Sequence, residues 1–126
     1  MMMKFAPLAF AAALTAGCAT LGSSNGDRTA VMRIGETTQF AGTKVTVVKL
    51  LEDSRCPAEV NCVWAGRVKI SLAIVRDGGT NMRELGSDAP IQALGGTLEL
   101  LQTRPERRAD RIIAPGDYRF TIRYMR

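Results

Sequence analysis

The strongest constraint on the fold of this chain is a period-two alternation of apolar and polar residues that runs through its last hundred or so residues. In residues 67–76 the apolar set is Val68, Ile70, Leu72 and Ile74. In residues 117–125 it is Tyr118, Phe120, Ile122 and Tyr124. Shorter or weaker runs cover residues 30–34, 37–41, 44–51, 80–85 and 97–103. Because successive side chains of an extended chain point to opposite faces, this pattern predicts strands with one buried and one solvated face.

Turn residues separate these runs at short, regular intervals. Residues 76–81, Arg-Asp-Gly-Gly-Thr-Asn, predict a β-hairpin, because glycine reaches the positive φ that primed turns require. No stretch sustains the three-and-four apolar period of a helix. Seven or so short antiparallel strands predict an all-β domain, an immunoglobulin-like β-sandwich, with a small β-barrel as the alternative. Residues 115–124 resemble the closing strand of many immunoglobulin-like domains.

The N-terminus has the features of an export signal. Lys4 precedes an apolar run, residues 5–16, that is too short to span a membrane. The run ends in Thr-Ala-Gly-Cys, which resembles the lipobox of bacterial lipoproteins, although the usual large aliphatic residue three places before Cys18 is a threonine. The resemblance implies that Cys18 carries lipid and becomes the new N-terminus. Ala19 in place of aspartate favours the outer membrane of a Gram-negative cell, facing the periplasm. The alternative is an ordinary secretory signal cut near Ala16.

This interpretation divides the chain into three parts: a signal peptide (residues 1–17), a lipidated cysteine with a polar tether (18–28), and one domain (29–126). The whole chain has 17 Lys+Arg and 12 Asp+Glu, a formal net charge of +5. The basic residues alternate with strand positions rather than clustering among aromatic ones, and the export signal directs the protein away from nucleic acid. We therefore expect no nucleic-acid partner.

Cys56 and Cys62 remain once Cys18 is assigned to the anchor. In an oxidising compartment an even pair of thiols predicts a disulfide, and closing so short a loop contributes roughly 2 to 2.5 kcal/mol. A labile redox switch is an alternative, although thiol redox enzymes have two residues between their cysteines and this chain has five. A zinc site is disfavoured, because zinc needs four ligands drawn mainly from Cys and His and the chain has no histidine. A copper site built from a thiolate and Met82 or Met125 would match no known motif. No metal or cofactor is expected.

Residues 52–66, Glu-Asp-Ser-Arg-Cys-Pro-Ala-Glu-Val-Asn-Cys-Val-Trp-Ala-Gly, resemble a motif of small bacterial secreted proteins and lipoproteins. That family shows Asp-Ser-Arg-Cys-Pro, a short spacer, and Cys-x-Trp-x-Gly. The resemblance implies the disulfide and a β-rich fold, and it carries no activity. Gly66 is expected to allow a tight turn into the next strand.

Five residues of this segment form the candidate binding loop. Asp53 is expected to start the loop with an Asx-turn, and Pro57 to stiffen it. Trp64 is expected to cover the disulfide or to plug the edge of the sandwich. Arg55 either pairs with Asp53 or Glu59 as a structural residue, or acts as a cationic anchor on a rigid loop.

A second candidate is the arginine-rich segment of residues 104–111. Its arginines are Arg104, Arg107, Arg108 and Arg111, set against Glu106 and Asp110. It is either a solvated loop or a patch that meets lipid phosphate or an acidic glycan. We expect it at the opposite end of the sandwich from residues 52–66.

These features favour a non-enzymatic envelope module, held to the membrane by its lipid and binding an envelope protein or a surface polymer through its loops. The alternative is a secreted protease inhibitor that uses residues 55–61. An enzyme is disfavoured, because a chain without histidine cannot build a Ser-His-Asp or Cys-His arrangement and the acids are scattered.

Overall fold

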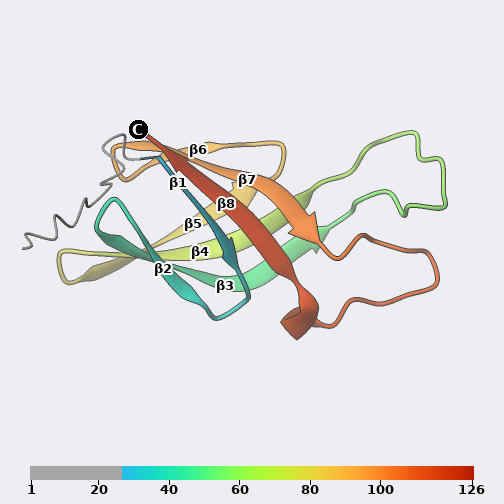
Figure 1. Ribbon diagram of the computed structural model, residues 1–126, viewed down its shortest axis with the longest axis horizontal. Coiled ribbons are helices and arrows are strands. Elements are labelled where there is room, and N and C mark those ends of the chain that lie inside the picture. The colour runs from blue at the N-terminus through green and yellow to red at the C-terminus, as the bar shows by residue number, and fades with distance from the viewer. Residues whose placement is uncertain (1–26) are drawn as a thin grey trace, which may run out of the picture.

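Eight strands and one short 3-10 turn form in residues 27–126, the part of the chain that the computed structural model describes (Figure 1). The strands are β1 (Arg28–Met32), β2 (Thr37–Phe40), β3 (Thr43–Asp53), β4 (Val68–Arg76), β5 (Gly79–Gly86), β6 (Ile91–Ala93), β7 (Gly96–Arg104) and β8 (Arg119–Met125). The 3-10 turn, η1, is Pro115–Asp117. The seven predicted strands are all present. The three-residue β6 was missed because it is too short to show an alternation. Cys18, the predicted signal peptide and most of the predicted tether lie outside the described residues.

The strands form two four-stranded antiparallel sheets, ordered β1-β8-β7-β6 and β2-β3-β4-β5. The predicted all-β antiparallel sandwich is therefore confirmed. Within each sheet the hydrogen-bonded neighbours are consecutive in the sequence, except that β8 returns to pair with β1. Strands β2 to β5 and β6 to β8 therefore form two meanders, with β1 at the edge beside β8, and this order differs from the Greek key of immunoglobulin domains.

The predicted hairpin joins β4 to β5. Asp77 and Gly78 occupy its two turn positions with φ of 47° and 79°, and Arg76 pairs with Gly79. Two successive positive φ values define the primed turn whose twist matches that of the flanking strands. Asp-Gly is a preferred sequence for this turn, so the local chemistry sets the register of the hairpin.

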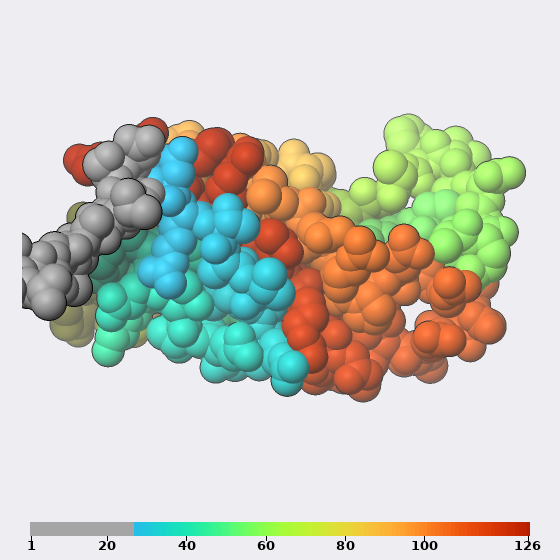
Figure 2. Space-filling model, in the orientation of Figure 1, coloured from blue at the N-terminus to red at the C-terminus, as the bar shows by residue number. Residues whose placement is uncertain are grey.

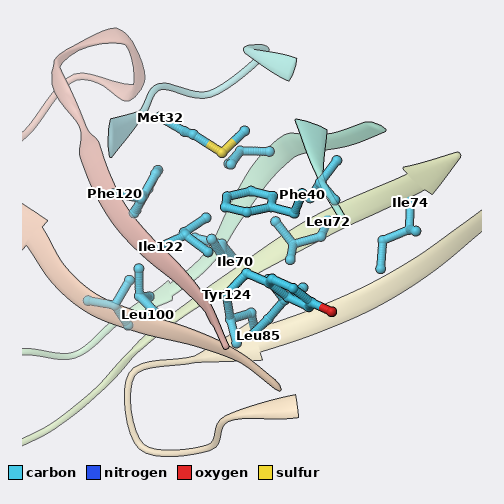
Figure 3. Packing of buried hydrophobic residues seen from close by; sticks show 14 of the residues in the cluster. Met32, Phe40, Ile70, Leu72, Ile74, Leu85, Leu100, Phe120, Ile122 and Tyr124 are labelled. Atoms are coloured by element: carbon cyan, nitrogen blue, oxygen red, sulfur yellow. The ribbon is translucent and has the colours of Figure 1, made fainter. Parts of the chain in front are cut away.

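The core lies between the sheets and takes its side chains from the alternating positions of both (Figure 3). All of the predicted inward residues of β4 and β8 are buried, together with Tyr118 just before β8. The largest fully buried side chains include Tyr124, Phe40, Phe120 and Met32. The hydroxyl of Tyr124 donates to the carbonyl of Leu94 at 2.8 Å, so its buried polar atom has a partner.

The two long loops leave the sandwich at the same end (Figure 1). The disulfide loop, residues 54–67, joins β3 to β4, and the basic loop, residues 105–118, joins β7 to β8 and contains η1. We call this the loop end. The first described residue, Asp27, lies at the other end, where its carboxylate accepts a hydrogen bond from the backbone N–H of Arg126 at 3.4 Å. Within residues 27–126, no helix has the length and apolar character needed to cross a membrane.

Candidate binding surface

The base of the disulfide loop is an ion pair between two of the predicted site residues. Arg55 donates from Nε to Asp53 Oδ1 at 2.8 Å and from Nη2 to Oδ2 at 2.9 Å. The two side chains are 20% and 9% exposed. A bidentate pair this well shielded is stronger than a surface ion pair. Arg55 thus makes the pair with Asp53 that its structural interpretation predicts.

The same two residues start the loop and tie it to its neighbour. The backbone N–H of Arg55 lies 3.4 Å from Asp53 Oδ1, the contact of the predicted Asx-turn. Nη1 of Arg55 also donates to the carbonyls of Thr103 and Pro105, at 2.9 and 3.0 Å. Because these carbonyls belong to the end of β7 and the start of the basic loop, Arg55 links the two loops.

Arg107 makes the reciprocal link. Its Nη1 donates to the carbonyls of Asp53 and Arg55, both at 3.1 Å, and its own carbonyl accepts from the backbone N–H of Ala58 at 2.9 Å. The prediction that the arginine-rich segment lies at the opposite end of the sandwich from the disulfide loop is thus wrong. It failed because nothing in a sequence shows which backbone carbonyls two distant arginines will reach.

Tyr118 completes the base. Its hydroxyl donates to Asp53 Oδ2 at 2.8 Å, and its ring stacks on Phe120 with centroids 5.6 Å apart. Burial and the hydrogen bond to the Asp53 carboxylate raise the pKa of Tyr118 to about 12. Burial alone would raise the pKa of Asp53, but the hydrogen bonds from Arg55 and Tyr118 and the charge of Arg55 outweigh it, so the pKa lies below its usual value. Asp53 is therefore held ionised as an acceptor.

The closure of the disulfide loop also follows the sequence prediction. Cys56 and Cys62 are bonded, with their Cα atoms 5.8 Å apart. Gly66 has φ of +70°, and a Cβ there would lie 1.8 Å from the carbonyl oxygen of Ser54. Only glycine fits this turn. It allows Ser54 and Arg67 to pair, with the Ser54 N–H donating to the Arg67 carbonyl at 2.8 Å.

The tip of the disulfide loop differs from the prediction. Trp64 is 82% exposed, and Val63 beside it is 93% exposed. Trp64 therefore neither covers the disulfide nor plugs the edge of the sandwich. The expectation rested on the usual burial of tryptophan, whereas the turn at Gly66 is closed by hydrogen bonds between Ser54 and Arg67. Pro57 is partly buried in the same loop, two residues after Arg55.

Glu59 holds the middle of the disulfide loop against the basic loop. Its Oε1 accepts from the backbone N–H of Ala109, and its Oε2 lies 3.8 Å from Nη1 of Arg108. It does not pair with Arg55. This carboxylate makes a further bridge between the loops, separate from those of Arg55 and Arg107.

The basic loop encloses an open cavity of about 460 Å³, visible as a hollow in the orange segment of Figure 2. We call it the basic groove; its lining is Arg104, Pro105, Glu106, Arg108, Arg111, Asp117 and Arg119. Three of the four predicted patch arginines line it, whereas Arg107 turns inward to the base. Arg119 joins the groove from β8. Sequence reasoning missed it because its position in a strand gave no sign that it would face the loop.

The ion pairs in and beside the groove are weak. Arg104 lies 4.0 Å from Glu106, and both side chains are more than half exposed. Such a pair contributes between zero and about 1 kcal/mol. Arg111 has neither an ion pair nor a side-chain hydrogen bond within residues 27–126. The guanidinium groups of Arg104 and Arg111 can therefore turn toward an anion at little cost, whereas Nη1 of Arg119 donates to the carbonyls of Gly116 and Tyr118, both at 3.2 Å.

The described part of the chain shows no group of three or more His, Cys, Asp or Glu placed to hold a metal ion. Comparisons with protein-family models, with curated proteins and with solved structures found no match for this chain. The resemblance of residues 52–66 to small envelope proteins therefore stays a prediction.

Proposed function

We propose that this protein is a non-enzymatic binding module of the bacterial cell envelope, anchored through Cys18 and binding its partner with the loop end of the sandwich. The export signal and the lipobox-like Thr-Ala-Gly-Cys support an outer-membrane lipoprotein that faces the periplasm. The disulfide is consistent with that oxidising compartment.

One observation carries the binding role: a rigid base presents a solvent-exposed apolar tip. The disulfide loop is held by a covalent bond, by the bidentate Arg55–Asp53 pair and by Arg107. Yet Val63 and Trp64 at its tip are 93% and 82% exposed. An exposed tryptophan on a rigid loop contributes nothing to the core, and it can bury a large apolar area against a partner with little ordering cost.

The position of the tether supports the same role. Asp27 lies at the far end of the sandwich from both loops (Figure 1). An anchor attached there leaves the loop end unobstructed, so the loops are the natural surface for a partner.

The alternative, a protease inhibitor that uses residues 55–61, is less well supported. An inhibitory arginine must enter the cleft of the protease, whereas all three nitrogens of the Arg55 guanidinium donate to Asp53, Thr103 and Pro105. Removing it from these acceptors would leave two carbonyls without this donor and the Asp53 carboxylate with only the Tyr118 hydroxyl as a side-chain donor.

The test is photo-crosslinking in intact cells with a photoreactive residue in place of Val63. Glu59 is a poorer site because it bridges the two loops. A matched probe replaces Lys44, which is exposed near the opposite end of β3. We expect one recurrent envelope component at position 63, none at position 44, and loss of capture in a Trp64→Ala variant. Equal capture at both positions would refute a binding role for the loop end.

A further inference from the structure

Positive charge is concentrated in the basic groove. Four arginines line it against two carboxylates, Glu106 and Asp117, so its local net charge is +2. The planar guanidinium of arginine can donate two parallel hydrogen bonds to two oxygens of one phosphate. The cavity, at about 460 Å³, is within the size range of small-ligand sites.

Apolar side chains protrude from the same end of the sandwich. The three most exposed large apolar side chains in the described residues are Ile112, Val63 and Trp64, at 97%, 93% and 82%. All three lie on the two loops of the loop end, and Ile112 directly follows Arg111 of the groove. The loops that carry them are held together by the Ala58–Arg107 backbone hydrogen bond at 2.9 Å.

Separate apolar tips on the same end of the domain as a basic groove suit a lipid surface better than a folded partner. A specific protein interface buries on the order of 800 Å² on each side in a continuous, complementary patch. Two narrow tips on different loops do not form such a patch. The interfacial layer of a bilayer requires no complementary pocket, favours tryptophan, and places anionic phosphates next to the apolar layer.

We infer that the loop end docks on an anionic phospholipid surface. Trp64, Val63 and Ile112 enter the interfacial layer, and the basic groove binds headgroup phosphate. This inference names the partner of the proposed binding surface and so rests on the proposed function. Because the tether leaves from the far end, docking on the anchoring membrane requires the long axis of the domain to lie along that membrane; the alternative is a second membrane facing the loops.

Trp64 is the only tryptophan of the chain, so its fluorescence reports directly on the tip. The experiment uses the mature chain, residues 18–126, with Cys18→Ser to leave it unlipidated; it contains every described residue. Vesicles of phosphatidylglycerol and phosphatidylcholine are compared with vesicles of phosphatidylcholine alone. We expect the emission of Trp64 to move to shorter wavelength only with the anionic vesicles, to be quenched by bromine-labelled acyl chains, and to recover at high salt.

Variants of the groove test the phosphate contact. Arg108→Gln and Arg111→Gln should each weaken vesicle binding about five-fold. The double variant Lys44→Gln/Arg76→Gln removes two positive charges near the far end, twice as many as either groove variant, and should still bind like the unmodified mature chain. Glu106→Gln removes a carboxylate from the groove and should tighten binding by roughly two- to five-fold. A folding defect would expose apolar surface and raise binding to both kinds of vesicle, so a gain confined to the anionic vesicles cannot come from one.

Three results would overturn the inference. One is an unchanged Trp64 emission with anionic vesicles at low salt. Another is equal binding to both kinds of vesicle, unaffected by the groove variants. The third is binding of inorganic pyrophosphate that depends on Arg111, without any response to vesicles. If the vesicles give no response while the Val63 probe captures a protein in cells, the lipid inference fails and the proposed binding function stands.

Discussion

Arg107 and Arg108 are adjacent residues of the basic loop, but their guanidinium groups meet different surroundings. Arg107 points into the loop base and donates to the carbonyls of Asp53 and Arg55, both at 3.1 Å. Arg108 reaches only the carboxylate of Glu59, at 3.8 Å, and is half exposed. The first is a structural residue and the second is available to a ligand. The nearby backbone decides between the two roles. Leaving a buried carbonyl without a donor costs more free energy than an exposed ion pair contributes.

The disulfide loop repeats this contrast between base and tip. At the base, Arg55 and Asp53 use most of their hydrogen-bonding capacity within the protein. At the tip, Trp64 has no burial that would explain its presence. A rigid base with an unused tip is the arrangement expected of a binding loop, in which stability and recognition depend on different residues.

Replacing Arg55 is expected to have the largest effect on stability. Arg55→Ala leaves Asp53 charged in a shielded site and removes the donor for the carbonyls of Thr103 and Pro105. We expect a loss of about 3 kcal/mol in the free energy of unfolding, measured by urea titration. Arg108→Ala is the matched control and should change it by less than about 0.5 kcal/mol. Equal losses in the two variants would show that the base and the groove do not differ as described.

Removing the disulfide should have the next largest effect. Cys56→Ser/Cys62→Ser reopens a loop whose ends are six residues apart, and we expect it to lower the free energy of unfolding by about 2 kcal/mol. The Arg55 and Arg107 bridges remain, so the variant should still unfold in a single cooperative transition in urea. Loss of that transition would mean that the covalent bond, rather than the arginines, holds the base.

The sheets could be predicted because the alternation of apolar and polar residues is visible within each predicted strand. The alternation in β4 and β8 gave the buried faces, and Asp77-Gly78 gave a hairpin. The two sheets, their antiparallel pairing and the core follow from such local patterns. The place of β1 beside β8 could not be read from them, because this pairing joins residues from opposite ends of the domain, such as Met32 and Phe120.

The candidate site was predictable only over short separations. The Asx-turn at Asp53 and the Arg55–Asp53 pair join residues two positions apart, and the need for Gly66 follows from a tight turn. The contact between Tyr118 and Asp53 joins residues 65 positions apart, so no spacing could indicate it. The exposure of Trp64 was missed for a different reason: burial is a tendency of the residue type, and the direction of a loop depends on its base.

The Tyr118–Asp53 hydrogen bond gives the smallest predicted effect, and pH isolates it. The pKa of Tyr118 is raised from about 10 in the unfolded chain to about 12 in the folded protein. A raised pKa means that the contribution is complete below pH 10 and is lost as the pH rises toward 12. Between pH 8 and pH 11 the unmodified protein should therefore lose about 1 kcal/mol more of its unfolding free energy than Tyr118→Phe, which has no phenol to ionise. Urea titrations of both proteins at the two pH values measure this difference, and all other titrating groups cancel in it. Parallel losses would mean that Asp53 is held by Arg55 alone, so the base would be joined to the core through β3 and not through the Tyr118 that precedes β8.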